Sequence, residues 1–125
     1  VHIISQRRVR NEEVKGITQD PPCPPKWINC WMITGRQRVA KFKEEAENEV
    51  LLHIFVARLP NVLTDLVITF NQATAVDKSS SSADAEVNEL AEWGEEIIEL
   101  LAQSLRISHW NLFGETQGGE LAANP

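Results

Sequence analysis

The sequence predicts an α/β layered (α+β) domain in which an antiparallel sheet is flanked by helices. Apolar runs with strand character follow one another at short spacing, and a long segment with helical periodicity comes after a serine-rich stretch. The 125 residues leave room for one domain rather than two. A composition of 42% hydrophobic and 24% charged residues is ordinary for a folded protein.

The chain opens with a predicted strand over residues 1–9, where apolar and polar side chains alternate. Asn11 and the two glutamates that follow it indicate a short capped helical turn. We expect Gly16 and the proline cluster beyond it to end this turn, so residues 18–26 are predicted to form a linker.

Three further strands are predicted over residues 27–42, 49–59 and 64–71. All three have apolar side chains on both faces, which predicts a sheet with helices above and below it. Gly35 indicates a β-bulge in the first of the three. The connections are short, including an acidic turn over residues 44–48, and this favours an antiparallel meander.

The clearest element is a predicted helix over residues 85–105. Its apolar side chains recur about every 3.6 residues and are expected to be buried, each contributing about 1.5–3 kcal/mol: Leu90, Trp93, Ile97, Leu101 and Leu105. Gly94 costs about 1 kcal/mol relative to alanine inside a helix, so we expect close packing there. A loop over about residues 73–86 precedes the helix. Residues 1–114 thus form a single domain, and residues 115–125 form a disordered tail.

Charge is distributed unevenly along the chain. Residues 1–43 carry a net charge of +6 and residues 44–125 carry −12, which gives the overall −6. An acidic protein is a poor match for nucleic acid, because backbone phosphates are neutralised by Lys and Arg. A protein partner with a basic surface fits better.

The candidate partner-binding residues lie on the acidic side of the predicted helix and just beyond it: Glu92, Glu95, Glu96, Glu99 and Trp110. The glutamates have two interpretations, since they form either a solvated surface or an acidic docking face that steers a basic partner. Trp27 and Trp110 flank the predicted core. Each is either an interface anchor or a cover for an edge of the sheet.

No catalytic, metal-binding or cofactor-binding pattern stands out, so we do not expect an enzyme. His53 alternates with apolar residues and is expected to be a hydrogen-bonded core histidine, and Asp65 is explained by capping or turn chemistry. Cys23 and Cys30 are expected to be reduced thiols, which favours a reducing compartment. No apolar run is long enough to span a bilayer and no signal peptide is recognised, so we expect no membrane insertion.

Four segments resemble the Mog family of Ran-binding nuclear import factors in order and spacing: residues 30–37 (CWMITGRQ), 59–60 (LP), 64–72 (TDLVITFNQ) and 104–114 (SLRISHWNLFG). The resemblance implies an antiparallel sheet with helices on both sides, similar to the PsbP fold. It also implies a protein of the nucleus and cytoplasm that binds the GTPase Ran and promotes release of its nucleotide. Such a factor needs no cofactor and supports nuclear protein import.

The resemblance covers the C-terminal part of the family's domain. The family's N-terminal half, which contains an acidic stretch important for Ran binding, has no counterpart here, so no Ran-contacting residue is carried over. We expect that half to have been cleaved away or to accompany this chain as a separate one. Two rival hypotheses remain, namely an interaction scaffold of the same fold for another trafficking partner and a PsbP-like module that binds a small ligand or metal.

Overall fold

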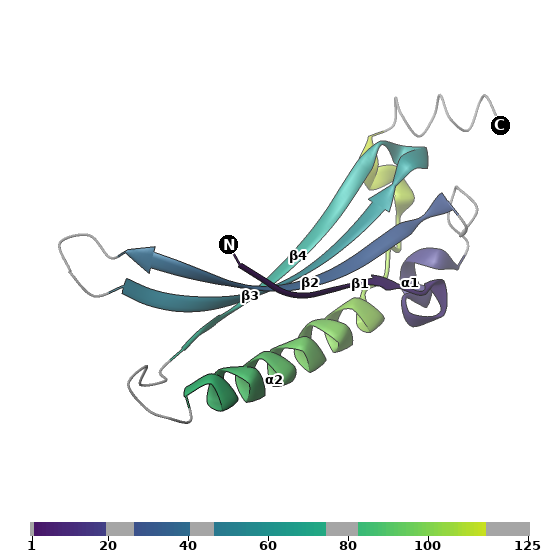
Figure 1. The fold of residues 1–125 in the computed structure, drawn as a ribbon. Coiled ribbons are helices and arrows are strands. Elements are labelled where there is room, and N and C mark those ends of the chain that lie inside the picture. Colours follow the sequence, from purple (N-terminus) through teal and green to yellow (C-terminus); the bar gives the residue numbers. More distant parts are fainter. Residues whose placement is uncertain (1, 20–26, 41–46, 75–82, 115–125) are drawn as a thin grey trace.

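Four strands form one antiparallel sheet, and the long helix α2 crosses one face of it (Figure 1). The computed structural model describes residues 2–19, 27–40, 47–74 and 83–114. The elements are β1 (His2–Val9), η1 (Asn11–Glu13), α1 (Lys15–Thr18), β2 (Asn29–Ala40), β3 (Glu47–Leu59), η3 (Pro60–Val62), β4 (Thr64–Ala73), α2 (Ala83–Ser104) and η4 (Trp110–Phe113). Within these ranges, no helix combines the length and apolarity needed to cross a membrane.

The sheet has the order β1-β2-β3-β4, with every neighbouring pair antiparallel, so the predicted meander is confirmed. Two predicted connections are shorter than expected. β3 already begins at Glu47, and the loop predicted over residues 73–86 loses both ends, because β4 runs to Ala73 and α2 begins at Ala83. The serine run, the proline-flanked Cys23 and the predicted tail lie outside the described residues.

Two glycines have roles that differ from those predicted. Gly16 lies inside α1 rather than ending a helical turn. Gly35 pairs with Ile3, but the register shift lies on the opposite strand, between Ile3 and Ser5 of β1. The extra residue of the irregularity therefore belongs to β1, and β2 continues through Gly35 without interruption.

The two faces of the sheet have very different environments. On the face toward α2, buried side chains such as Phe55 and Leu59 belong to a core cluster that also includes Ile98 and Ala102 of the helix. On the other face, no described helix covers the apolar side chains, and Val67 keeps 59% of its surface exposed. The prediction of a helix on the sheet is confirmed, whereas helices above and below it are not found among the described residues.

Cys30 is a free, fully buried thiol on the covered face of β2, next to Val9 of β1 and Ala57 of β3 in the sheet register. Burial raises the pKa of its thiol to about 11, against a smaller opposing effect of the Arg8 charge. The neutral thiol is therefore the form that this core accommodates.

Stability is expected to fall as the pH rises from about 9 to about 11. In this window the unfolded chain releases the Cys30 proton while the folded chain retains it, so the contribution of the thiol is complete below pH 9 and lost above pH 11. The loss should be on the order of 3 kcal/mol, because the pKa differs by about two units and one unit corresponds to about 1.4 kcal/mol. Urea unfolding of the wild type and of Cys30→Ala at each pH measures it. An equally steep decline in Cys30→Ala would contradict the assignment.

Candidate functional site

A buried polar network determines where α2 lies on the sheet. His53 of β3 is fully buried, and its Nδ1 lies 3.1 Å from Thr34 Oγ1 while its Nε2 lies 2.6 Å from Gln72 Oε1. The prediction of a hydrogen-bonded core histidine is therefore confirmed. Gly94 of α2 passes directly over this network, where an added Cβ would stand 2.0 Å from His53 Nε2. Only glycine lets the helix approach so closely, as its sequence position predicts.

The buried side of α2 is only partly the one that the apolar periodicity predicts. Leu90, Ile97 and Leu105 are half-buried, and Leu90 and Leu105 pack against core clusters. The buried side chains of α2 are mostly small, and four of them belong to the core clusters: Val87, Ala91, Ile98 and Ala102. Trp93 is 53% exposed and Leu101 is 42% exposed, so their predicted burial is wrong. The physical reason is the close approach at Gly94. It orients the helix so that its small residues meet the sheet, while Trp93 lies to one side with its ring against Phe70 of β4.

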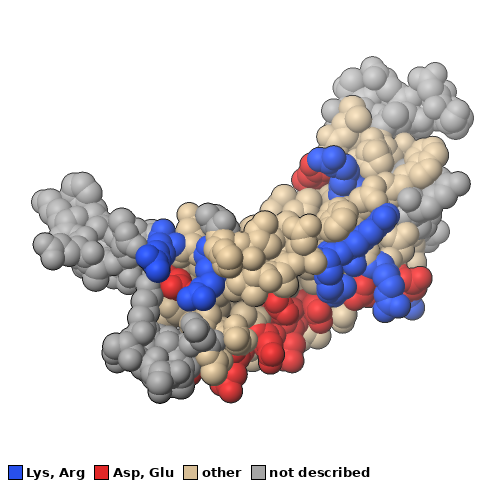
Figure 2. Space-filling view, viewed as in Figure 1, with Lys and Arg blue, Asp and Glu red and all other residues tan. Residues whose placement is uncertain are grey.

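The solvent side of α2 combines carboxylates with large apolar side chains. We define the α2 outer face as Glu89, Glu92, Trp93, Glu96 and Leu100, all of which are exposed. Figure 2 shows the acidic side chains gathered along this helix, with the basic side chains concentrated toward the ends of the sheet. The uneven charge of the sequence is thus also uneven in space.

Two of the predicted site residues, Glu95 and Glu99, accept hydrogen bonds from strand β1. The Ser5 hydroxyl donates to Glu95 Oε1 at 2.8 Å, and Arg7 donates to Glu99 Oε1 at 3.0 Å. Arg7 also pairs with Glu13 at 3.2 Å, and the hydrogen bond to Glu13 is the main cause that raises the pKa of Arg7. Glu95 and Glu99 therefore hold the edge strand β1 against α2.

The remaining predicted residues are divided between two places. Glu92 and Glu96 stay together on the α2 outer face. Trp110 lies beyond the helix in η4, where its ring is half-buried and tilted against Phe113 at a centroid distance of 5.6 Å. Trp110 packs against the core cluster, which favours its interpretation as a cover, whereas Trp27 is 52% exposed.

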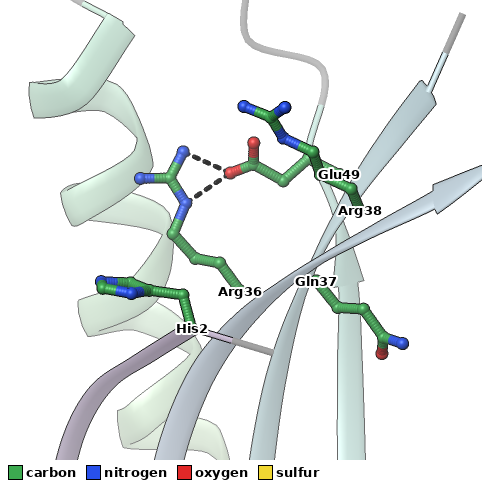
Figure 3. A pocket seen from close by; sticks show the side chains of 5 residues that line it. All are labelled: His2, Arg36, Gln37, Arg38 and Glu49. Carbon is green, nitrogen blue, oxygen red and sulfur yellow. Dashed lines mark hydrogen bonds and ion pairs between the residues drawn. The ribbon is translucent and has the colours of Figure 1, made fainter.

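A basic pocket at the end of the sheet was not predicted from the sequence. It has a volume of about 670 Å³ and is lined by His2, Arg36, Gln37, Arg38 and Glu49. Arg36 points toward the Glu49 carboxylate and pairs with it, whereas Gln37 points away (Figure 3). The alternating arginines of β2 were the only signal in the sequence, since His2 and Glu49 come from β1 and β3.

The chemistry available in the basic pocket is charge recognition. Two guanidinium groups, those of Arg36 and Arg38, and the carboxylate of Glu49 line the cavity, so the lining carries a net positive formal charge. A carboxylate of a partner protein is the matching group. No group of three or more His, Cys, Asp or Glu side chains placed to hold a metal ion occurs in the described part of the chain.

Asp65 has a different role from the capping or turn role that the sequence predicts. Its carboxylate pairs with Arg58 across β3 and β4 at 3.1 Å. The hydrogen bond from Arg58 lowers the pKa of Asp65. Both side chains are exposed, so this is a surface ion pair with little effect on stability.

Residues 2–73, which comprise the whole sheet, match the family model described as "Ran-interacting Mog1 protein". The chain belongs to this family. The match begins within β1 and ends at the last residue of β4, so it extends the resemblance seen in the sequence to β1 and α1. Helix α2 and its outer face lie outside the matched residues.

The names of curated relatives of this Mog1 family member also refer to Ran. A zebrafish (Danio rerio) protein named "Ran guanine nucleotide release factor" is 35% identical over 105 residues, covering 82% of this chain and 57% of the relative. The human protein of the same name is 36% identical over 84 residues, or 67% of this chain and 44% of the relative. A Dictyostelium discoideum protein named "Probable ran guanine nucleotide release factor" is 34% identical over 88 residues, or 66% and 45%. The chain spans about half the length of the curated relatives it matches.

Proposed function

We propose that this protein binds the small GTPase Ran and promotes release of its bound guanine nucleotide. It would act without catalytic residues, in the nucleus and cytoplasm, in support of nuclear protein import. The observation that carries the proposal is the family match over residues 2–73 together with the names of the relatives. We propose that the Ran contact lies on β1–β4 and at the basic pocket, and the match over the sheet supports this.

Nucleotide release requires no chemistry by the protein itself. A factor accelerates release when it binds the nucleotide-free GTPase more tightly than the loaded one. Coupling is reciprocal, so bound nucleotide should weaken the grip on Ran by the same factor, typically about 5- to 150-fold. A rigid binding surface is sufficient for this mechanism.

The open face of the sheet is a candidate contact surface for the N-terminal half that the sequence resemblance leads us to expect. Trp31 is 40% exposed there and Val67 is 59% exposed, while Ile33 and Ile54 are half-buried. We propose that a segment equivalent to the unmatched half of the relatives covers this face, within the same protein or as a separate chain. Each large side chain covered would contribute about 1.5–3 kcal/mol.

Release of a fluorescent guanine nucleotide from Ran, measured as this protein is titrated in, tests the function. We expect release to accelerate with concentration until Ran is saturated. A second titration adds the unmatched N-terminal part of the zebrafish relative in trans, and acceleration only in that case would show that the covered face completes the Ran contact. A small GTPase of another class is the specificity control. A folded sample that leaves the release rate unchanged in both titrations would exclude the proposed function.

A further inference from the structure

The α2 outer face carries large apolar side chains that the fold does not bury. Trp93 keeps 53% of its surface exposed and Leu100 keeps 61%. The two residues are seven positions apart, which places them on the same side of the helix, two turns from each other. Contact with the sheet is already made by the opposite side of α2, through Ala91, Gly94 and Ile98.

Trp93 is held in position by the sheet. Its ring lies 6.1 Å from the Phe70 ring, and Phe70 in turn stacks on the buried His53 ring at 5.8 Å. An anchor with a fixed orientation loses little conformational entropy when a partner binds. Tryptophan is also among the side chains that most often contribute large shares of binding energy. Half of the indole is therefore available as a preformed contact.

The charges around this apolar pair select the partner. Three glutamates flank Trp93 and Leu100 on the helix: Glu89, Glu92 and Glu96. They are three, four and seven residues from one another, so their like charges repel. Their carboxylates would repel a second copy of this face, an anionic lipid surface and a nucleic acid. A surface bearing Lys or Arg would relieve the repulsion while it covers the apolar side chains.

We propose that the α2 outer face is a docking surface for a basic amphipathic helix of a partner protein. The face extends from Glu89 to Leu100, about 17 Å at 1.5 Å per residue, so the partner helix needs roughly three turns. Its apolar side would pack on Trp93 and Leu100, and its flanking Lys and Arg would pair with the three carboxylates. This surface lies outside the family-matched sheet, and the inference does not depend on Ran binding.

A synthetic 14-residue peptide with leucines on one helical face and lysines elsewhere is the probe. Its binding to the 15N-labelled chain is followed by titration calorimetry and by amide chemical shifts. We expect shift changes concentrated in α2 and an affinity that falls as salt increases. A scrambled peptide of the same composition, which has no apolar face, should bind at least about tenfold more weakly, a difference of 1.4 kcal/mol.

Two matched pairs of variants locate the contact. Leu100→Ala should weaken binding about 5- to 10-fold, as expected for truncation of an interface anchor, whereas Leu112→Ala at an exposed site elsewhere should leave it unchanged. Glu96→Gln should reduce both the affinity and its salt dependence, whereas Glu12→Gln removes the same charge from another exposed site and should not. Circular dichroism confirms that each variant folds.

Four results would overturn the proposal. If the scrambled peptide bound equally well, net charge alone would explain the binding and no amphipathic helix would be required. If the two control variants lost as much peptide affinity as Leu100→Ala and Glu96→Gln, the α2 outer face would not be the binding site. Chemical-shift changes confined to the open sheet face around Trp31 and Val67 would lead to the same conclusion. Sedimentation showing that the chain dimerises through α2 would make a second copy the occupant instead.

Discussion

Replacing Gly94 with alanine is expected to destabilise the protein by about 2–4 kcal/mol, through overpacking and a broken buried hydrogen bond. The new Cβ would stand 2.0 Å from His53 Nε2 and 2.3 Å from Gln72 Oε1. Both groups are buried and bonded to each other, so neither can move aside without losing its partner. Helix propensity alone predicts the opposite sign, a gain of about 1 kcal/mol from alanine.

Urea unfolding followed by circular dichroism measures this change, with Asn88→Ala as the control at an exposed position of the same helix. The control should change stability by only a few tenths of a kcal/mol, in keeping with surface helix substitutions. A double-mutant cycle with His53→Ala identifies the cause. If the imidazole is the obstacle, the double variant should be at least about 1 kcal/mol more stable than the sum of the single effects predicts. Strict additivity would show that the clash lies elsewhere.

The strands and the helix could be predicted because their signals are local. Apolar runs separated by turn residues give β2 to β4, and the structure confirms β2 as Asn29–Ala40 and β4 as Thr64–Ala73. The hydrophobicity of a residue does not show, however, whether another element of the same chain packs over it. Residues such as Ile54 and Val67 have the same apolar character as buried ones, yet they lie on a face that no described helix covers. The sequence therefore predicted the strands correctly, whereas no helix of the expected second layer occurs among the described residues.

The rotation of α2 and the division of its glutamates could not be predicted, for a related reason. The periodic large residues, including Trp93, form the more hydrophobic side, and only the position of His53 beneath Gly94 reveals why the other side is buried. Glu95 and Glu99 differ from Glu92 and Glu96 only in their distant partners. Ser5 and Arg7 lie 90 and 92 residues away in the chain, a contact that spacing within the helix does not indicate.

Replacing Gly16 with alanine should detach the segment that follows α2 from the rest of the domain. The added Cβ would stand 1.8 Å from the Leu105 carbonyl oxygen and 3.0 Å from the Arg106 Cα, so the obstacle is main chain and cannot rotate away. The Gly16 carbonyl also accepts a hydrogen bond from the Ile107 amide at 3.2 Å. We expect a loss of about 2–4 kcal/mol, because overpacking and the loss of a hydrogen bond act together.

The Gly16→Ala and Gly94→Ala variants should lose structure in different parts of the domain. Leu105, Ile107 and Trp110 pack against the core cluster from this segment, so its detachment exposes them without disturbing the His53 network. Hydrogen exchange should therefore show lost protection of the Ile107 amide in Gly16→Ala, with β3 and β4 retaining theirs. Lys15→Ala, at an exposed neighbouring position, is the control and should leave Ile107 protected. A protected Ile107 amide in Gly16→Ala would mean that α1 shifts as a unit, and that the contact with Leu105 does not hold the end of α2 in place.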